Sequence, residues 1–258
     1  MHHAWGFHQH SSLWPDLVTP RTVRAGGRLR GAKATGKRYH GVPQVELPAP
    51  APLDSRLDEV LARRFSCRHF GGDPVSLATL ATWLLHSYGW HGLFTLGELP
   101  IPDRPVPSGG GAFPLEVYLF VRRADGLERG LYHVDAEQRV LARLRGPLPW
   151  AKVTEMFLGQ TSVAECDVVA VITAVVHRTL ARYGERGYRF LWMEAGHLAQ
   201  NLLLTATACD LGGLPIAGFY DQQLAASLDV DPTREVPLYA VALGPIATPD
   251  SGSTRALS

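Results

Sequence analysis

The sequence predicts an α+β fold, in which helices and strands follow one another without the regular alternation of a parallel α/β protein. Short apolar runs rich in β-branched residues, LEVYLFV at 115–121 and DVVAVITAVV at 167–176, indicate strands, the second of them buried on both faces. Apolar positions at helical spacing fill 188–209 and indicate a long, mostly buried helix. The 258 residues, 46% of them hydrophobic, are enough to bury a sizeable core.

The N-terminal part of the chain contrasts with this pattern. Residues 1–54 are rich in His, Arg, Gly and Pro and show no sustained period of 2 or 3.6, so we expect an extended arm that wraps a partner surface. Apolar spacing then predicts an amphipathic helix over 57–64, and Ser76 is placed to cap a second helix that reaches Tyr88. Each of these helices should bury one face. Residues 90–114 are dense in Gly and Pro, which predicts a loop.

The later elements follow without an interrupting linker. They are a hairpin of strands over 131–135 and 139–144, a helix over 148–158, a strand that begins near 214, a helix over 221–228 and a strand over 236–243. We therefore predict one domain over 55–246, preceded by the arm of 1–54 and followed by a flexible tail of 247–258.

Charge and cysteine content narrow the function classes. The formal net charge of +1 gives no general attraction to nucleic acid or membrane, although 21–38 carries seven Lys or Arg and no acid. The three cysteines, Cys67, Cys166 and Cys209, are odd in number and lack a metal-type spacing, so we expect neither a disulfide framework nor a metal site. No apolar run is long enough to span a bilayer and no signal peptide is evident, so a cytoplasmic protein is expected.

The segment RRFSCRHF at 63–70 is a candidate anion site. Arg64 and Arg68 lie four residues apart at the predicted end of a helix, with Ser66 between them. Two guanidinium groups and a hydroxyl there could hold a phosphate through charge-assisted hydrogen bonds. The alternative is a solvated helix end whose cations complement the helix dipole.

The segment SGGGA at 108–112 offers successive backbone N–H groups without side chains in the way. Such a backbone allows a flat ligand or an anion to lie against the main chain. The alternative is a plain glycine-rich loop.

A third segment, RYGERGYRFLWMEAGHLAQN at 182–201, collects polar residues at the start of the long helix. Tyr183 is a candidate proton donor or acceptor, with Arg182 or Arg186 as the neighbouring cation. The alternative is a tyrosine that caps the core, with the arginines paired to Glu185. Further along, Glu194, His197 and Asn201 recur at helical spacing, and their partners could be protein or ligand.

These segments, together with LPIAGFYDQQLAASL at 214–228, resemble in the same order the motifs of SagB-type dehydrogenases. Those are flavin enzymes of the nitroreductase superfamily that oxidise azoline rings in ribosomal peptides. RRFSCRHF is similar to the R-x-S-x-R stretch of nitroreductase-like proteins, and PSGGGAFPLEVY at 107–118 is similar to PSGGA-x-x-PLE-x-Y. The resemblance covers about 57–244.

The resemblance implies a nitroreductase-like three-layer fold, with a mostly antiparallel sheet flanked by helices, and a homodimer with two FMN molecules at the subunit interface. It assigns the FMN phosphate to Arg64, Ser66 and Arg68, the flavin ring to Pro107, Ser108, Gly109 and Gly110, the flavin surroundings to Gln200 and Asn201, and flavin N5 to the N–H of Gly218.

The resemblance also implies the reaction, a two-electron oxidation of a thiazoline or oxazoline ring in a peptide to the aromatic azole. SagB-type enzymes have a catalytic Lys-Tyr pair where this chain has Arg182 and Tyr183, so the resemblance implies these two as the catalytic residues. Because a guanidinium stays protonated and makes a poor base, proton transfer falls to Tyr183, or the activity is altered or lost. The implied partners are the azoline-containing peptide and a cyclodehydratase complex, with the basic arm of 21–38 holding an acidic leader peptide or the complex.

Two other functions stay open at this point. One is a nitroreductase-like enzyme that reduces a small molecule or a dehydroamino acid with NAD(P)H. The other is a catalytically silent scaffold subunit of a peptide-modifying complex.

Overall fold

The computed structural model describes residues 3, 4, 6, 7, 11, 12, 36–96 and 99–247. Its centre is a seven-stranded sheet in the order β1-β6-β5-β4-β7-β9-β8, and every neighbouring pair is antiparallel. The strands are β1 (Gln44–Glu46), β4 (Leu115–Val121), β5 (Gly130–Asp135), β6 (Val140–Arg145), β7 (Val168–Val175), β8 (Leu211–Ile216) and β9 (Glu235–Pro245). The α+β prediction with a mostly antiparallel sheet is confirmed.

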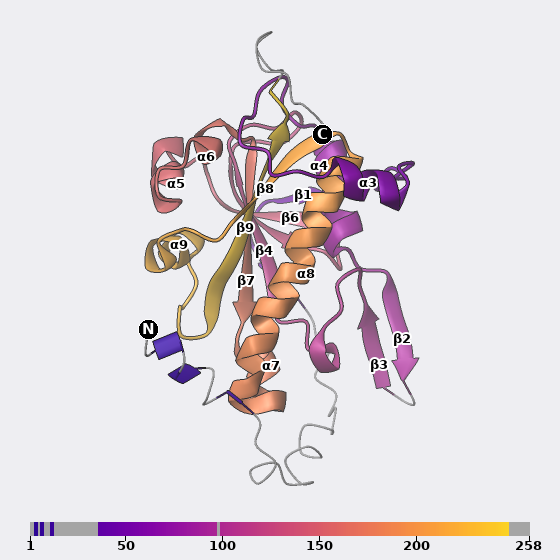
Figure 1. Ribbon diagram of the computed structural model, residues 1–258, viewed down its shortest axis with the longest axis vertical. Helices are drawn as coiled ribbons and strands as arrows, with labels where there is room; N and C mark the ends of the chain where they lie inside the picture. The colour runs from indigo at the N-terminus through magenta and orange to yellow at the C-terminus, as the bar shows by residue number, and fades with distance from the viewer. Residues whose placement is uncertain (1–2, 5, 8–10, 13–35, 97–98, 248–258) are drawn as a thin grey trace.

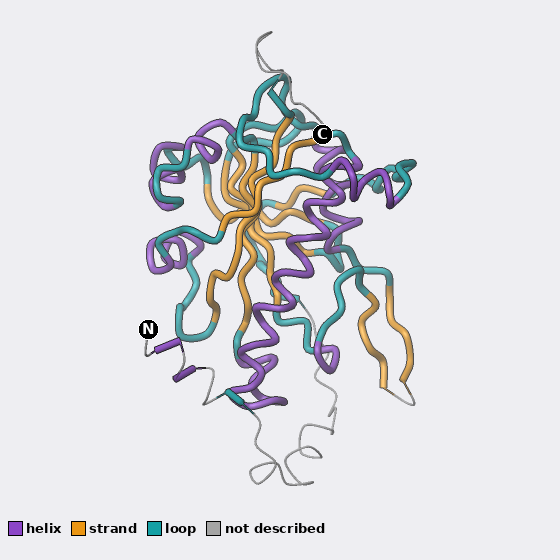
Figure 2. The backbone as a smooth tube through the Cα atoms, in the orientation of Figure 1, coloured by secondary structure: helices purple, strands orange, loops and turns teal. Residues whose placement is uncertain are grey.

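Helices cover both faces of this sheet (Figures 1 and 2). On one face lie α4 (Leu77–Tyr88) and the 22-residue α8 (Gly187–Ala208), and on the other lie α5 (Trp150–Met156), α6 (Thr161–Glu165) and α9 (Asp221–Leu228). The alternation of strand side chains explains this layering. Val117 and Leu119 of β4 pack in the core under α4 and α8, whereas Tyr118 and Phe120 pack toward α5 and α9.

Helix α4 shows how the predicted elements of the core are capped and packed. Ser76 accepts a hydrogen bond from the Thr79 N–H at 3.1 Å and so caps α4, as predicted. Trp83 on the buried face of α4 donates its indole N–H to the Leu202 carbonyl of α8 at 2.8 Å. This bond fixes the two helices against each other, because a buried indole N–H needs a partner.

Three expectations need correction. The predicted loop over 90–114 contains a two-stranded hairpin, β2 (Gly92–Leu96) and β3 (Leu99–Asp103), which stands apart from the main sheet. Pro100 and Pro102 are compatible with β3 because the strand pairs on one side only. Residues 44–46 of the predicted arm form β1 and pair with β6. The tail from 248 onward lies outside the described residues.

The third correction concerns α3 (Leu57–Arg63), which was expected to bury one apolar face. Only Val60 is buried, while Leu57 and Leu61 are 66% and 54% exposed. The amphipathic spacing predicted the helix correctly, but spacing does not determine whether another element covers the apolar side.

Three short helical elements complete the chain and lie close to the candidate site. A 3-10 turn, η1, spans Gly109–Gly111, α7 spans His177–Tyr183, and a second 3-10 turn, η2, spans Gly184–Arg186 and leads into α8. Among the described residues, no helix is long and apolar enough to cross a membrane.

Candidate functional site

The glycine loop, residues 107–111, packs against the start of α8. The Gly109 N–H donates to Glu194 Oε1 at 3.0 Å, and the Phe113 N–H donates to Ser108 Oγ at 2.8 Å. Gly110 and Gly111 have φ angles of 59° and 61°, the left-handed region that favours glycine. A Cβ at Gly110 would lie 2.5 Å from the Tyr183 hydroxyl oxygen, so glycine is required there for conformation and for space.

Tyr183 and Arg182 meet this loop from the end of α7. Tyr183 packs edge-on against Phe190, with ring centroids 4.9 Å apart, and its side chain is 36% exposed. Arg182 donates a guanidinium hydrogen bond to the Gly110 carbonyl. Tyr183 is therefore held against the loop and stays partly exposed, whereas Arg182 holds the loop backbone in place.

Glu194 is a site residue whose role the sequence analysis missed. Its side chain is buried on α8 and accepts the Gly109 N–H. Burial raises the pKa of Glu194, and the hydrogen bonds from Gly109 and Ser108 oppose that rise only in part. The sequence feature that could have identified Glu194 is a carboxylate on the otherwise apolar side of a long helix. Glu194 can orient the loop and can exchange a proton beside it.

The cation segment, residues 64–68, lies beside β8. Backbone bonding places it there: the Cys67 N–H donates to the Gly213 carbonyl at 3.0 Å, and Ser66 forms a bridge to Gly213. Arg68 is exposed, and Arg64 is half-buried at the end of α3. Within the described ranges, neither guanidinium forms an ion pair with a carboxylate. The segment therefore retains donors and positive charge for an external anion, which fits the phosphate of FMN.

The other predicted residues are placed as follows. Gly218 follows β8, and its carbonyl accepts a hydrogen bond from Gln160 at 3.3 Å. Gln200 is exposed on α8. Asn201 is half-buried and donates to the carbonyls of Pro105 at 3.3 Å and Ser87 at 3.5 Å. Its contacts in the chain thus hold the segment that leads into the glycine loop.

Two groups of the predicted residues, the glycine loop and the cation segment, lie near opposite ends of α8 (Figure 1). The glycine loop contacts Phe190 and Glu194 near the start of the helix. The cation segment lies beside Gly213, which packs against Leu203 and Ala206 in the last two turns of the helix. Arg63 pairs with Asp210 just past the helix end. At about 1.5 Å per residue, the helical stretch from Glu194 to Leu203 is about 14 Å long. The two groups therefore lie apart along α8 within one chain.

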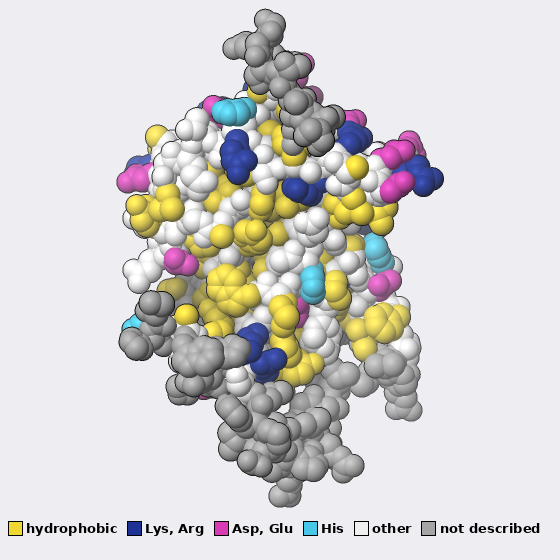
Figure 3. Space-filling model, in the orientation of Figure 1, with side chains coloured by type: hydrophobic (Ala, Val, Ile, Leu, Met, Phe, Trp, Pro, Cys, Tyr) yellow, Lys and Arg dark blue, Asp and Glu magenta, His cyan; other side chains and the backbone are white. Residues whose placement is uncertain are grey.

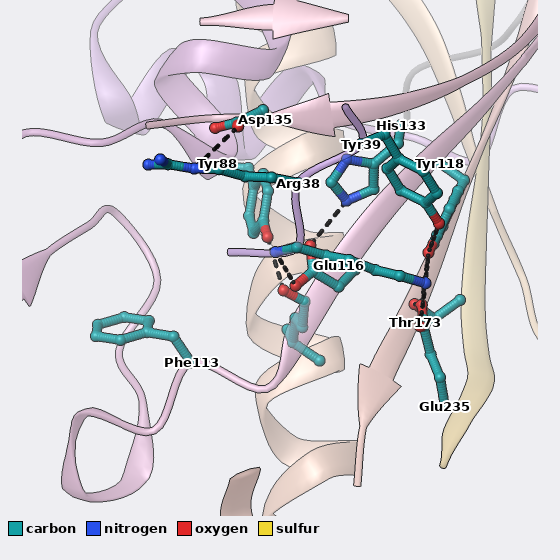
Figure 4. A network of polar contacts seen from close by, with 12 residues as sticks. Arg38, Tyr39, Tyr88, Phe113, Glu116, Tyr118, His133, Asp135, Thr173 and Glu235 are labelled. Atoms are coloured by element: carbon teal, nitrogen blue, oxygen red, sulfur yellow. Dashed lines mark hydrogen bonds and ion pairs between the residues drawn. The ribbon is translucent and has the colours of Figure 1, made fainter. Parts of the chain in front are cut away.

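A buried polar network around Glu116 lies next to the glycine loop and contacts Phe113, just after it (Figure 4). Glu116 accepts hydrogen bonds from Arg178 at 2.6 Å and from the Lys37 N–H at 2.9 Å, and it contacts the His133 ring nitrogen at 2.8 Å. Burial alone would raise the pKa of Glu116, but the hydrogen bond and charge of His133 and the charge of Arg178 lower it overall. Arg178 also donates to the Phe113 carbonyl at 3.1 Å, which ties the network to the loop.

The same network anchors the end of the predicted basic arm. The Lys37 ammonium group pairs with Glu235 at 2.8 Å. Burial lowers the pKa of Lys37, but the hydrogen bonds and charges of Glu235 and Tyr39 outweigh burial, so the pKa of Lys37 is raised overall. Arg38 pairs with Glu137 at 2.7 Å. These two cations of the arm thus bind carboxylates of their own domain, while 21–35 lie outside the described residues.

Comparison with known proteins identifies the family. The model of the Nitroreductase family matches residues 61–245. The chain is 31% identical over 204 residues to the nitroreductase-named protein MJ1384 of Methanocaldococcus jannaschii, a match that covers 78% of this chain and 96% of that relative. It is also 26% identical over 153 residues to McbC, the microcin B17-processing protein of Escherichia coli, and this match spans 55% of this chain and about half, 54%, of McbC.

Solved structures agree on the fold. A nitroreductase-type protein from Anabaena variabilis superposes with a TM-score of 0.72 at 23% identity, covering 98% of this chain and 51% of that one. A chain of the E. coli microcin synthetase McbBCD complex, with truncated pro-MccB17 bound, superposes with a TM-score of 0.63 at 19% identity, covering 95% and 92%. A nitroreductase-type protein of Desulfovibrio desulfuricans in complex with FMN gives 0.52 at 19%, covering 79% and 94%. The nitroreductase-like fold is confirmed, and the chain belongs to the nitroreductase family, with McbC as a distant homologue.

Proposed function

We propose that this protein is a SagB-type, FMN-dependent dehydrogenase that oxidises azoline rings to azoles in a ribosomally made peptide. The observation that carries the proposal is the Tyr183 hydroxyl held against the Gly110 backbone, in a loop with the PSGGGAFPLEVY sequence. The homology to McbC, a protein named for processing microcin B17, supports a peptide substrate. The superposition on a chain of McbBCD is consistent with a multi-subunit modifying complex, in which the partner of this chain is a cyclodehydratase.

FMN fits the residues present. Arg64, Ser66 and Arg68 would bind its phosphate, and the backbones of 107–110 and Gly218 would bind its ring. When bound, FMN supplies the two-electron acceptor for the oxidation. The FMN complex of a protein with this fold supports the choice of cofactor.

The residues of the chain would then position the ring and move the proton. Tyr183, in its deprotonated form, would accept the proton that leaves the azoline carbon, because the residue is partly exposed at the glycine loop. Arg182 keeps the Gly110 carbonyl fixed rather than acting as a base. Glu194 fixes the Gly109 N–H, so the loop backbone is oriented before the substrate binds.

The two groups of site residues support a homodimer. Since they lie near opposite ends of α8, one flavin would contact both where a second copy brings its glycine loop to the cation segment of the first. Hydrophobic side chains gather on the face that α8 crosses (Figure 3), and Trp192 and Met193 of α8 are 47% and 50% exposed. An exposed apolar area of this kind is typical of subunit contacts.

The first test is the visible spectrum of the freshly purified protein, with any released cofactor identified by mass. The proposal requires bound FMN, or FMN uptake on reconstitution. A colourless protein that cannot be reconstituted, yet co-purifies with a cyclodehydratase, would identify a scaffold instead.

The second candidate function is an NAD(P)H-dependent reductase, which one residue and one relative favour. Arg182 replaces the lysine of SagB-type enzymes, and MJ1384 carries a nitroreductase name. A reductase that uses NAD(P)H would bleach its flavin when NAD(P)H is added without oxygen, and an azoline peptide would not be required.

A further inference from the structure

A cavity of about 370 Å³ lies between the hairpin β2–β3 and the glycine loop. Its walls are mostly apolar, with Phe94 and Ile101 contributed by the hairpin as a directly paired couple. The glycine loop contributes Ser108, Gly110 and Gly111 to the opposite wall. Because Ser108, Gly110 and Gly111 line it, a ligand in this cavity would lie next to the proposed flavin position.

Arg104 is the cation of this cavity. Its guanidinium carbon lies 5.1 Å from the ring centroid of Tyr88, 5.4 Å from that of Trp90 and 5.3 Å from that of Phe113. Three rings around one guanidinium hold it in a defined orientation. The arginine is thus placed in advance, which lowers the entropy lost when it binds a ligand.

The charge of Arg104 is not neutralised within the described part of the chain. No carboxylate there forms an ion pair with it, and its buried Nε has no hydrogen-bond partner there. Tyr88 does not supply a negative charge, because burial raises its pKa to about 12 and its hydroxyl donates to the Leu115 carbonyl at 2.7 Å. Asp103 lines the cavity and is exposed, but it is not within ion-pair distance of Arg104. A partly buried guanidinium beside a cavity, without an ion-pair partner among the described residues, favours an anionic ligand.

The hairpin favours a peptide as the carrier of that anion. In the described residues, β2 and β3 pair only with each other, so each has an unpaired edge. β2 contains no proline and therefore keeps its full set of N–H donors. An extended peptide can bind along such an edge and place alternate side chains in the pocket beside it.

We propose that the cavity is a carboxylate subsite, in which Arg104 binds an acidic side chain of the peptide substrate close to the ring that is oxidised. This inference rests on the proposed function, because it places that substrate beside the glycine loop. The planar guanidinium can take the carboxylate in a two-point contact, while Phe94, Ile101 and Phe113 contact the side-chain methylenes.

The test uses two synthetic thiazole hexapeptides that differ only in a Glu or a Gln next to the ring, titrated calorimetrically into the purified full-length protein. The wild type should bind the Glu peptide about tenfold to hundredfold more tightly than the Gln peptide. Arg104→Met should abolish that preference, and Arg104→Lys should keep part of it. Arg129→Met, at an exposed arginine outside the cavity, should behave as the wild type. Thermal unfolding of each variant checks that it is folded.

Equal affinity of the wild type for the two peptides, or a preference that persists in folded Arg104→Met, would overturn the subsite. A wild type that binds NADPH instead, and loses it in Arg104→Met, would also overturn it and assign the cavity to a nicotinamide nucleotide. Turnover of the matching thiazoline peptides separates the two proposals. A preference for the Glu peptide without any oxidation would support the subsite and contradict the proposed function. Oxidation without that preference would support the proposed function and contradict the subsite.

Discussion

The two ends of α8 differ in how completely the chain satisfies its own polar groups. At the start of the helix, the glycine loop is held by Glu194, Arg182 and the network behind Phe113. At the far end, Arg64 and Arg68 are positioned through backbone contacts with β8, and in the described residues their guanidinium groups have no carboxylate partners. The first end is built to orient a reacting group, and the second to bind an anion. Neither is a complete site, which is why we assign the complete site to two chains.

The largest expected effect comes from removing the anion-binding end. Arg64→Ala combined with Arg68→Ala should weaken FMN binding by at least about hundredfold, because two charge-assisted contacts to the phosphate are lost. Equilibrium titration with FMN, followed by flavin fluorescence, measures the change. Arg63→Ala is the matched control, since Arg63 pairs with the exposed Asp210 and should leave FMN affinity unchanged. Stoichiometric FMN in the double variant would refute the assignment of the phosphate.

Complementation tests whether the two ends come from different chains. Tyr183→Phe should lower turnover by about 10²–10⁴-fold as a lost proton acceptor, with FMN still bound. Co-expression of Tyr183→Phe with Arg64→Ala/Arg68→Ala should give heterodimers with about half of the wild-type activity, since one of two interface sites then keeps both wild-type groups. Differently tagged subunits allow the heterodimer to be isolated. An inactive heterodimer would show that each site is built from one chain.

Gly110→Ala tests the close packing at the loop end. The new Cβ would lie 2.5 Å from the Tyr183 hydroxyl at a φ of 59°, so the variant should lose about 1–3 kcal/mol of unfolding free energy and much of its turnover. Combining it with Tyr183→Phe should restore part of the stability, because the clashing oxygen is gone. Gly146→Ala serves as the control, with nothing within 4 Å of the added carbon. Additive losses in the double variant would rule out the clash with the hydroxyl as the cause.

The last expected effect is a pH dependence of stability that originates in the buried network around Glu116. The pKa of Glu116 is lowered in the folded protein from its ordinary value of 4.5, so its stabilisation is fully present above that value and is lost as pH falls through the lower folded-state pKa. Glu116→Gln should therefore be less stable than the wild type at neutral pH, by about 3 kcal/mol. The gap should close in acid. Urea unfolding across the acid range measures it, and a gap independent of pH would remove the carboxylate charge as its source.

Local patterns predicted the parts of the fold whose partners lie nearby or whose burial is complete. The Ser76 cap depends on residues within one turn of its helix. The sequence indicates β7 and α8 through long apolar patterns, although β7 pairs with the distant strands β4 and β9. The hairpin β2–β3 was missed because its glycines and prolines dominate the local signal. The strand β1 is only three residues long and is held by β6, about a hundred residues away.

In the candidate site, too, the sequence indicated local segments but not the contacts between distant residues. The motifs located the glycine loop and the cation segment, but the bond from Gly109 to Glu194 joins residues 85 positions apart, and no local spacing encodes it. Glu116, His133 and Arg178 likewise meet only through the pairing of β4, β5 and the start of α7. Arg104 was hidden in a stretch that composition alone assigns to a loop.

The proposed oxidation is tested most directly by mixing the FMN-loaded protein with a thiazoline peptide in the absence of oxygen and of NAD(P)H. We predict that the visible absorption of the flavin is lost while the peptide is converted to the thiazole form, as detected by mass. An unchanged spectrum and an unchanged peptide, in a protein whose flavin is then bleached by NAD(P)H, would contradict the proposal and identify a reductase.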